Sequence, residues 1–283
     1  MTAMLAIDAL TLDYLGRPVK RLVKGISLTL DHGRALALVG ESGAGKSLTS
    51  LTVMDLLPAG IVRTAGRIVI NGRDLDGLTP GEKRQLRGGT VAMIMQNPMS
   101  AFDPVFTIRS HFAETLAAHE DTITGRGSVA NRARSALAEA GFSEPDAILD
   151  AYPFQMSGGM LQRVMIALAL VTGPDLLIAD EATTDLDAPS QKRIVDLLRR
   201  ERLKRKLSLL LITHDLSVAA SLADEIAIMH QGVIVESVPA RDVFDAPRDA
   251  YTRKLINAHN RLYRETEPDH DHAGEAHAAC VPM

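Results

Sequence analysis

The chain has 283 residues, of which 46% are hydrophobic and 23% are charged, and its 31 basic residues stand against 35 acidic ones. This composition is typical of a globular protein with a substantial core, and the net charge of −4 creates no basic field that would attract nucleic acid. We therefore expect no nucleic-acid partner, and the single cysteine, Cys280, excludes an intrachain disulfide framework and a thiolate zinc site.

Targeting and membrane-spanning signals are weak along the chain. Residues 1–13 have neither a positively charged leader nor a long apolar run, so we expect no secretory signal there. The most apolar helical stretch, residues 160–171, is interrupted by Gln162 and Arg163. We therefore expect a chain that does not span a membrane by itself, and the single cysteine fits a reducing compartment.

The first elements predict an antiparallel β layer. Residues 7–14 and 22–30 alternate apolar and polar positions in the manner of half-buried strands, and a turn around residues 16–18 joins them. Tyr14 ends the first strand, where its ring could stack on a purine. From the residues alone, an ordinary amphipathic tyrosine at a strand end explains it equally well.

The next stretch carries the clearest motif. Residues 35–39 predict a buried strand, and residues 48–57 predict a helix. The motif between them is Gly40, Glu41, Ser42, Gly43, Ala44, Gly45, Lys46 and Ser47. Two glycines separated by four residues and followed by Lys and Ser are typical of a loop whose backbone N–H groups cradle phosphates at a helix N-terminus. The sequence therefore predicts a nucleoside triphosphate site, with Lys46 on the β- and γ-phosphates and Ser47 on Mg²⁺.

Short elements follow this loop. Residues 66–70 predict a strand that ends in an Asn-Gly turn, residues 79–86 a short helix, and residues 90–95 an apolar strand. Gln96 comes directly after this last strand, at the edge where ligands bind in open α/β sheets. Taken alone, an amide at this place is better explained as a cap of the turn.

The chain changes character after residue 104. Two amphipathic helical segments, at 108–119 and 131–140, are separated by a polar stretch that contains glycine, and no strand is evident. This pattern predicts a helical subdomain inserted into the α/β core. The next helix begins with three small residues that offer an anion-binding geometry, although such helix starts are common. These residues are Ser157, Gly158 and Gly159.

Polar side chains follow two further buried strands. Residues 175–179 predict an apolar strand that ends in Asp180 and Glu181. Two adjacent carboxylates at such a place are costly unless they serve a cation or a proton transfer, so we interpret this pair as functional. Residues 209–213 predict another strand, and it ends in His214, which in isolation is more often a cap than a catalyst.

The order of the elements predicts the fold class. Strands and helices alternate from residue 35 onward, which argues for an α/β fold with a mainly parallel sheet and helices on both faces. Residues 190–204 predict a strongly charged helix, which we interpret as a solvated outer face. Residues 226–235 predict a hairpin with its turn at Gln231 and Gly232.

Taken together, these motifs resemble those of the ATP-binding subunit of an ABC transporter, and the similarity covers residue 5 to about residue 263. Residues 40–47 resemble Walker A. Residues 176–180 resemble Walker B, and Glu181 resembles the catalytic glutamate that follows it. The resemblance implies a P-loop NTPase core with an antiparallel β layer and an inserted helical subdomain.

The remaining family motifs follow in the expected order. Gln96 resembles the Q-loop glutamine, and residues 157–159 resemble the core of the signature motif. Asp187 resembles the D-loop aspartate, and His214 resembles the switch histidine. Tyr14 falls where the family places an aromatic residue under adenine.

The resemblance also implies roles, with ATP and Mg²⁺ as cofactors. Lys46 and the loop amides would hold the phosphates, Glu181 would be the general base, and His214 would contact the γ-phosphate. Gln96 would sense the γ-phosphate or the metal, which places it in the catalytic set beside Glu181 and His214. The implied ligands of Mg²⁺ are Ser47, Gln96 and Asp180.

Domains and partners follow from the same resemblance. It implies an ATPase domain over residues 1–246 with the helical subdomain at about 104–172, a C-terminal extension at 247–264, and a histidine-containing tail at 265–283. In this family the signature residues complete the ATP site of a second ATPase subunit, here a related but different one. Two membrane-spanning permease subunits and an extracytoplasmic substrate-binding protein would complete an importer. The chain would lie peripherally on the cytoplasmic face of the cell inner membrane.

Subgroup features indicate the transported substrate. Residues 96–104 resemble the extended Q-loop of peptide and nickel importers, and residues 250–255 resemble their C-terminal extension. The peptide branch commonly carries a cysteine cluster there, and this chain has none. Four segments look closest to nickel-import ATPases, namely 57–60, 64–66, 92–96 and 258–263. We therefore expect a nickel importer, with a dipeptide or oligopeptide importer as the alternative.

Two other classes fit less well, and two positions depart from the family pattern. A soluble ABC ATPase would typically carry a coiled-coil insertion or a second cassette, and a kinase would not need the signature segment. Ala182 stands where the family usually has Pro, and Met160 stands where it usually has Gln. The tail, with His270, His272 and His277, could bind Ni²⁺, but its polar composition also fits a solvated tail without that role.

Overall fold

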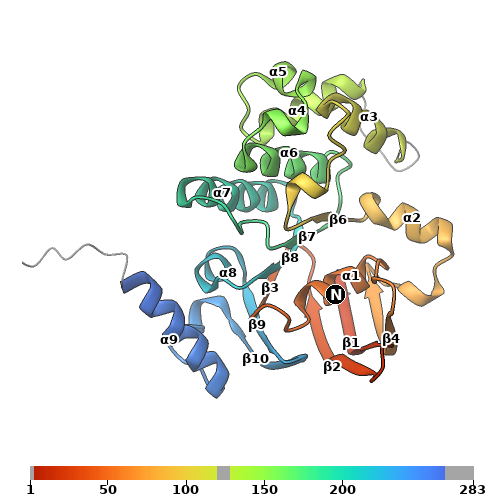
Figure 1. Ribbon diagram of the computed structural model, residues 1–283. Coiled ribbons are helices and arrows are strands. Elements are labelled where there is room, and N and C mark those ends of the chain that lie inside the picture. Colours follow the sequence, from red (N-terminus) through yellow and green to blue (C-terminus); the bar gives the residue numbers. More distant parts are fainter. Residues whose placement is uncertain (1–2, 120–127, 265–283) are drawn as a thin grey trace, which may run out of the picture.

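The computed structural model of the chain describes residues 3–119 and 128–264. Its strands are β1 (Leu5–Tyr14), β2 (Lys20–Leu30), β3 (Ala35–Val39), β4 (Ile61–Ile70), β5 (Arg73–Asp74), β6 (Val91–Ile94), β7 (Leu176–Asp180), β8 (Ser208–Thr213), β9 (Glu225–His230) and β10 (Val233–Pro239). Its α-helices are α1 (Lys46–Val53), α2 (Pro80–Gly89), α3 (Ile108–Ala117), α4 (Val129–Glu139), α5 (Pro145–Asp150), α6 (Gly158–Leu170), α7 (Ala188–Arg205), α8 (Leu216–Leu222) and α9 (Ala250–Arg264). Helices α3 to α6 gather at one end of the molecule, and the antiparallel strands β1, β2 and β4 lie at the other (Figure 1).

The central sheet has the strand order β10-β9-β3-β8-β7-β6. Neighbouring strands from β9 to β6 are parallel, and β10 runs antiparallel to β9. Every residue of β3, β7 and β8 is buried, as their unbroken apolar runs predicted, because a parallel sheet is covered on both faces. Parallel strands end at one edge of the sheet, so the loops that follow β3, β6, β7 and β8 meet there.

The two faces of this sheet are covered differently. Leu36 and Leu38 of β3 pack with the antiparallel sheet, whose order is β2-β1-β4-β5, and with α1. Ala37 and Val39 face the other way and pack with helices α6, α7 and α8. The predicted α/β fold with an antiparallel layer is therefore confirmed. The sequence predicted helices on both faces of the central sheet, but the antiparallel sheet covers much of the face that carries Leu36 and Leu38.

Several element ends differ from the prediction. Helix α1 stops at Val53 rather than at residue 57, and Asp55 beyond it has a φ of 54°. Strand β4 begins at Ile61 rather than at residue 66, because it pairs along the whole of β1. Helix α5 was not predicted, since its 6 residues are too few to show a helical period.

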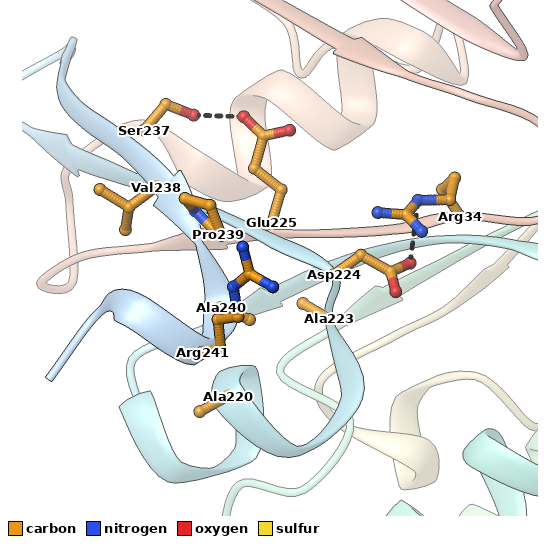
Figure 2. A pocket seen from close by; sticks show the side chains of 10 residues that line it. All are labelled: Arg34, Ala220, Ala223, Asp224, Glu225, Ser237, Val238, Pro239, Ala240 and Arg241. Atoms are coloured by element: carbon orange, nitrogen blue, oxygen red, sulfur yellow. Dashed lines mark hydrogen bonds and ion pairs between the residues drawn. The ribbon is translucent and has the colours of Figure 1, made fainter. Parts of the chain in front are cut away.

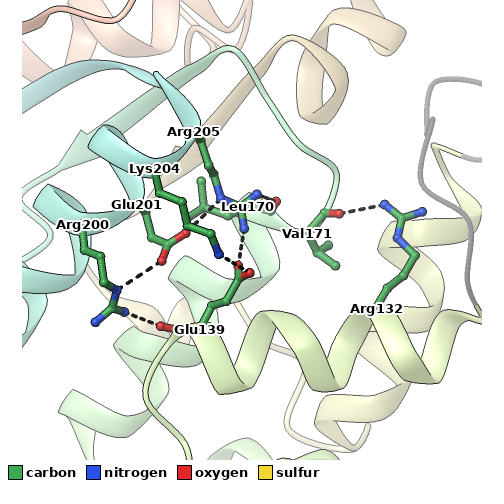
Figure 3. Close-up of polar contacts among 8 residues, drawn as sticks. All are labelled: Arg132, Glu139, Leu170, Val171, Arg200, Glu201, Lys204 and Arg205. Carbon is green, nitrogen blue, oxygen red and sulfur yellow. Dashed lines mark hydrogen bonds and ion pairs between the residues drawn. The ribbon is translucent and has the colours of Figure 1, made fainter.

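The C-terminal half of helix α7 is only partly the solvated face that its charges suggested. Glu201 is only 1% exposed and accepts hydrogen bonds from Arg200 and Arg205. Lys204 and Arg205 also pair with the carboxylate of Glu139, at the end of α4 (Figure 3). The interpretation therefore holds for the exposed side chains of Arg200 and Lys204 but missed the buried Glu201, because the charge pattern of one helix does not reveal that a second helix ends against it.

Helix α9 lies beside β10 and α8 (Figure 1). Ile256 is 5% exposed and belongs to the main core, and His259 is 2.9 Å from the Ser217 hydroxyl of α8 through its Nε2. Within residues 3–119 and 128–264, no helix is both long and apolar enough to cross a membrane. The domain boundaries stay a prediction, and the tail at 265–283 lies outside the described residues.

Candidate functional site

A cavity of about 240 Å³ lies where the loops after β3, β6 and β7 meet. Its lining comes from segments far apart in the sequence, which the parallel sheet brings to one edge. The lining residues are Leu22, Ser42, Gly43, Gly45, Lys46, Ser47, Leu48, Gln96 and Glu181. The structure therefore brings together the glycine-rich loop, Gln96 and Glu181, as the sequence motifs require.

The glycine-rich loop needs its glycines for two separate reasons. A side chain on Gly40 would place its Cβ 2.1 Å from the carbonyl oxygen of Met229, so the loop packs directly on the end of β9. Gly43 and Gly45 have φ values of 80° and 108°, which L-residues with side chains rarely adopt. In the described part of the chain, no side chain caps the first turn of α1, which leaves its N–H groups to a bound anion.

Lys46 is folded back into its own loop. Its side chain is 4% exposed, and its ammonium group donates hydrogen bonds to the carbonyl oxygens of Gly40 at 2.7 Å and Glu41 at 3.0 Å. Burial lowers the pKa of Lys46, and the nearby carboxylates of Glu181 and Asp180 oppose that shift. The Lys46 cation is thus held at the cavity by two backbone carbonyl oxygens.

Ser47 and Asp180 form an oxygen pair that suits a hard cation. The Ser47 hydroxyl donates to Oδ1 of Asp180 at 3.0 Å, and the Asp180 residue is 6% exposed. Burial raises the pKa of Asp180, the hydrogen bond from Ser47 lowers it, and the charge of Glu181 raises it, which leaves it above its usual range. Hydroxyl and carboxylate oxygens are ligands that Mg²⁺ accepts beside waters and phosphates, so these two residues fit that ion.

Glu181 is the point on which the other predicted residues converge. Its Oε2 accepts hydrogen bonds from the amide of Gln96 at 2.9 Å and from the hydroxyl of Thr184 at 3.3 Å. Its Oε1 lies 3.6 Å from Nδ1 of His214 and 3.9 Å from the Lys46 ammonium. The residue is 8% exposed, so the carboxylate is held by several groups at a largely buried position.

The backbone of Glu181 is in an uncommon conformation. Its φ is 48°, and its N–H donates to the carbonyl oxygen of Ile212 at 2.8 Å. A non-glycine residue in this region costs free energy and persists where its surroundings enforce it. The turn forms with Ala182 in place of the proline that the family pattern favours, and the Thr184 N–H closes it on the Glu181 carbonyl at 3.1 Å. The chain thus leaves β7 sharply and turns the carboxylate toward the cavity.

The signature residues lie apart from this cavity. Ser157 accepts a hydrogen bond from the N–H of Met160 at 3.3 Å and so caps α6. A Cβ on Gly159 would lie 3.0 Å from the Ser190 hydroxyl, at the start of α7. Asp187 caps α7 through the Ser190 N–H, and its hydrogen bonds with Ser190 lower its pKa. Their predicted role in a second subunit's site is not tested by one chain.

Tyr14 also lies outside the cavity lining. Its ring is 47% exposed and covers Gly16 and Gly60, where added Cβ atoms would lie 2.2 Å and 3.2 Å from ring carbons. The two glycines therefore leave room for an exposed aromatic face at the end of β1. Stacking of adenine on this face stays a prediction.

Three contacts of the site were not predicted. Leu22 lines the cavity, Thr184 binds the Glu181 carboxylate, and Tyr251 contacts the loop backbone. Leu22 and Thr184 lie in a strand and a polar loop with no distinctive pattern. Tyr251 lies in a segment that resembles the importer extension, but its contact joins residues too distant in sequence to be inferred.

A second hollow, of about 680 Å³, lies at the opposite end of β9 (Figure 2). Its charged groups are already paired, since Asp224 lies 3.5 Å from Arg34 and Glu225 accepts a hydrogen bond from Ser237. It is larger than the cavity at Lys46, but its lining residues include no glycine-rich loop and no N-terminus of an α-helix. Size alone does not make this hollow a reactive site, and the predicted site residues Lys46 and Glu181 lie in the smaller cavity or at its edge.

Comparisons with known proteins agree with this geometry. The family model described as ABC transporter matches residues 23–184. The chain belongs to the ABC transporter family. Nickel import ATP-binding protein NikD of Rhodospirillum rubrum is 47% identical over 263 residues, which cover 92% of this chain and 96% of that protein. The protein of the same name from Brucella abortus is 42% identical over 264 residues, with the same two shares of 92% and 96%.

A solved structure of an ATP-binding cassette shows that the fold matches as well. A dimeric ATP-binding cassette in a post-hydrolysis state, bound to ADP and Pi, superimposes with a TM-score of 0.74 at 25% identity. The match covers 84% of this chain and 99% of that cassette. The resemblance to ABC ATP-binding subunits and the predicted fold class are therefore confirmed.

Proposed function

We propose that the chain is the ATP-binding and ATP-hydrolysing subunit of an ABC importer for nickel ions. The observation that carries the hydrolytic part is the convergence on Glu181 of Gln96, His214 and Lys46. The names of its relatives, which are 42% to 47% identical over 92% of the chain, support nickel as the cargo.

Binding begins at the glycine-rich loop. The loop N–H groups and the Lys46 ammonium bind the phosphates of ATP, with Lys46 leaving at least part of its present pairing with Gly40 and Glu41. Ser47 and Asp180, which share a hydrogen bond, would hold Mg²⁺ together with Gln96. When bound, that ion supplies charge neutralisation for the phosphoryl group.

Hydrolysis requires a base beside the γ-phosphate. Glu181 accepts a proton from the attacking water, and the Gln96 amide and the Thr184 hydroxyl keep its carboxylate aimed at the cavity. His214 lies on the opposite carboxylate oxygen, where it contacts the γ-phosphate oxygens. Phosphoryl transfer depends mainly on such positioning and electrostatic stabilisation, because the protein supplies little covalent chemistry.

A second ATPase subunit completes the site. The signature residues 157–159 do not line this chain's own cavity, which leaves them to cover the nucleotide of a partner. The dimeric form of the ADP-bound cassette supports this arrangement. We propose a heterodimer with a related ATPase subunit that closes around ATP and opens after hydrolysis, with Asp187 at the junction.

An exposed apolar surface supports docking to membrane-spanning permease subunits. Met99, Val105, Phe106 and Phe154 are 45% to 70% exposed, although they are large and apolar. Their segments lie side by side, because the Ile108 N–H donates to the Ala151 carbonyl at 3.0 Å. Exposed apolar side chains gathered in this way mark interaction sites. We propose that this face binds a membrane-spanning permease subunit in an importer that has two of them. The chain would then lie peripherally on the cytoplasmic side of the inner membrane, with a substrate-binding protein on the far side.

Uptake of radioactive Ni²⁺ and of a labelled dipeptide, in cells with Glu181→Gln and in matched wild-type cells, tests the cargo. Loss of nickel uptake alone is the expected result. Loss of dipeptide uptake alone would mean that the cargo is a peptide rather than nickel, and the proposed hydrolytic roles would stand. Normal uptake of both would contradict the importer assignment.

A further inference from the structure

A buried carboxylate anchors the C-terminal helix α9 to β10. The Glu236 side chain accepts the N–H groups of Arg248 at 2.8 Å and Asp249 at 3.1 Å, and the residue is 8% exposed. The Asp249 carboxylate in turn accepts the N–H of Tyr251 at 2.7 Å. These bonds fix the place where α9 begins, and with it the direction in which Tyr251 projects.

Tyr251 reaches from this helix to the phosphate-binding loop. Its phenolic oxygen accepts the backbone N–H of Glu41 at 3.3 Å. Its ring stacks on His230, with centroids 3.8 Å apart and planes 24° apart. His230 is the last residue of β9, directly after Met229, on whose carbonyl Gly40 packs. The ring and the strand end therefore support the first two residues of the loop together.

The backbone of residues 40–41 is held from two sides. Lys46 donates to the carbonyl oxygens of Gly40 and Glu41, and Tyr251 accepts the Glu41 N–H. When Lys46 binds the phosphates of ATP, its hydrogen bonds to the Gly40 and Glu41 carbonyl oxygens weaken. Tyr251 bonds the Glu41 N–H rather than either carbonyl oxygen, so Tyr251 and Lys46 do not compete for the same atom. Burial also raises the pKa of Tyr251, which keeps its phenol neutral.

We propose that Tyr251 is a positioning residue, which keeps Gly40 and Glu41 in the phosphate-binding conformation while Lys46 changes partners. The C-terminal extension thereby becomes part of the nucleotide site rather than an appendage to it. This inference rests on the proposed ATP site at residues 40–47. It assigns α9 a task that neither the loop motif nor the fold requires.

The test uses the full-length chain and a fluorescent ATP analogue with Mg²⁺, so that the affinity is measured without turnover. Tyr251→Phe keeps the ring stack and removes the acceptor oxygen. Loss of one such hydrogen bond is expected to weaken binding about three- to tenfold. The amide proton of Glu41 should move upfield in the NMR spectrum, because it loses its acceptor, while the melting temperature stays close to that of the wild type.

A control on the same helix separates the effect of the Tyr251 hydrogen bond from a general disturbance of α9. The Arg253 guanidinium donates to the carbonyl oxygens of Pro247 and Arg248, so Arg253→Gln removes polar contacts of the same segment and leaves the Tyr251 hydroxyl and the Glu41 N–H unchanged. Wild-type affinity in this variant supports the proposal. Equal weakening in both variants, or an unchanged affinity and Glu41 resonance in Tyr251→Phe, overturns it.

The same titration distinguishes the inference from the function on which it rests. Lys46→Ala should weaken binding far more than Tyr251→Phe, because it removes the charge that faces the phosphates. If the wild-type chain binds the analogue no better than Lys46→Ala does, the ATP site itself is refuted and the inference falls with it. If Lys46→Ala weakens binding and Tyr251→Phe does not, only the role of Tyr251 is refuted.

Discussion

Replacement of Gly40 by alanine tests whether the loop depends on its packing against β9. The new Cβ would lie 2.1 Å from the Met229 carbonyl oxygen, well inside the 3.4 Å at which ordinary contact begins. That neighbour is backbone in a fully buried part of β9, so either the loop or the strand must move by about 1 Å. Overpacking of this kind costs about 1–3 kcal/mol. In a domain of this size that corresponds to a fall in melting temperature of about 2–10 °C.

Gly43→Ala is the matched control, because it introduces strain without a clash. Gly43 has a φ of 80° and nothing within 4 Å of its added Cβ. We expect a cost of about 1 kcal/mol from the left-handed conformation alone. Thermal unfolding followed by circular dichroism and titration with ATP compare the two variants. If Gly40→Ala melts and binds ATP as the wild type does, the packing argument for the loop is refuted.

Two further predictions concern charge. Burial raises the pKa of Glu236, but its hydrogen bonds, including those from the N–H groups of residues 248 and 249, together outweigh burial and leave that pKa lowered. The stabilisation that Glu236 contributes is therefore present above the unfolded pKa near 4.5 and disappears as the pH falls through the lower folded value. Glu236→Gln should lose about 1 kcal/mol at pH 7 and little at the acid end of that window, measured by urea unfolding across pH. Glu139→Gln should also lose about 1 kcal/mol, because Lys204 and Arg205 lose their shared partner, whereas Asp150→Asn, which breaks an exposed pair with Arg109, should lose less than about 0.5 kcal/mol. Equal losses from Glu139→Gln and Asp150→Asn would refute the view that the Glu139 cluster joins α4 to α7.

The parts of the site that the sequence could predict are motifs whose residues lie close together in the chain. The spacing of Gly40, Gly45 and Lys46 predicts a phosphate loop, and the Asp180-Glu181 pair at the end of an apolar strand predicts a cation or proton-transfer site. Parallel strands bring such strand-end residues to one edge of a sheet, so the meeting of Gln96 with Glu181 follows from the fold class.

The parts that sequence could not predict depend on contacts between distant segments. Tyr251 and Glu41 are 210 residues apart, and no periodicity connects them. Glu139 and Arg205 are 66 residues apart, so the sequence does not indicate that α4 pairs with α7. The charge pattern of α7 also fits a helix that is exposed to solvent. The early end of α1 depends on packing that the sequence does not show. Helix α5 has only 6 residues, which are too few to display a helical period.

The most direct test of the account is ATP turnover by Glu181→Gln, measured beside its ATP affinity in the same preparation. Removal of a general base should slow hydrolysis by about 100-fold or more, while the amide still fits beside Gln96, Thr184 and His214 and binding persists. Glu225→Gln, on a carboxylate outside the cavity, serves as the control and should hydrolyse ATP at the wild-type rate. Turnover by Glu181→Gln equal to that of the wild type would contradict the assignment of Glu181 as the base.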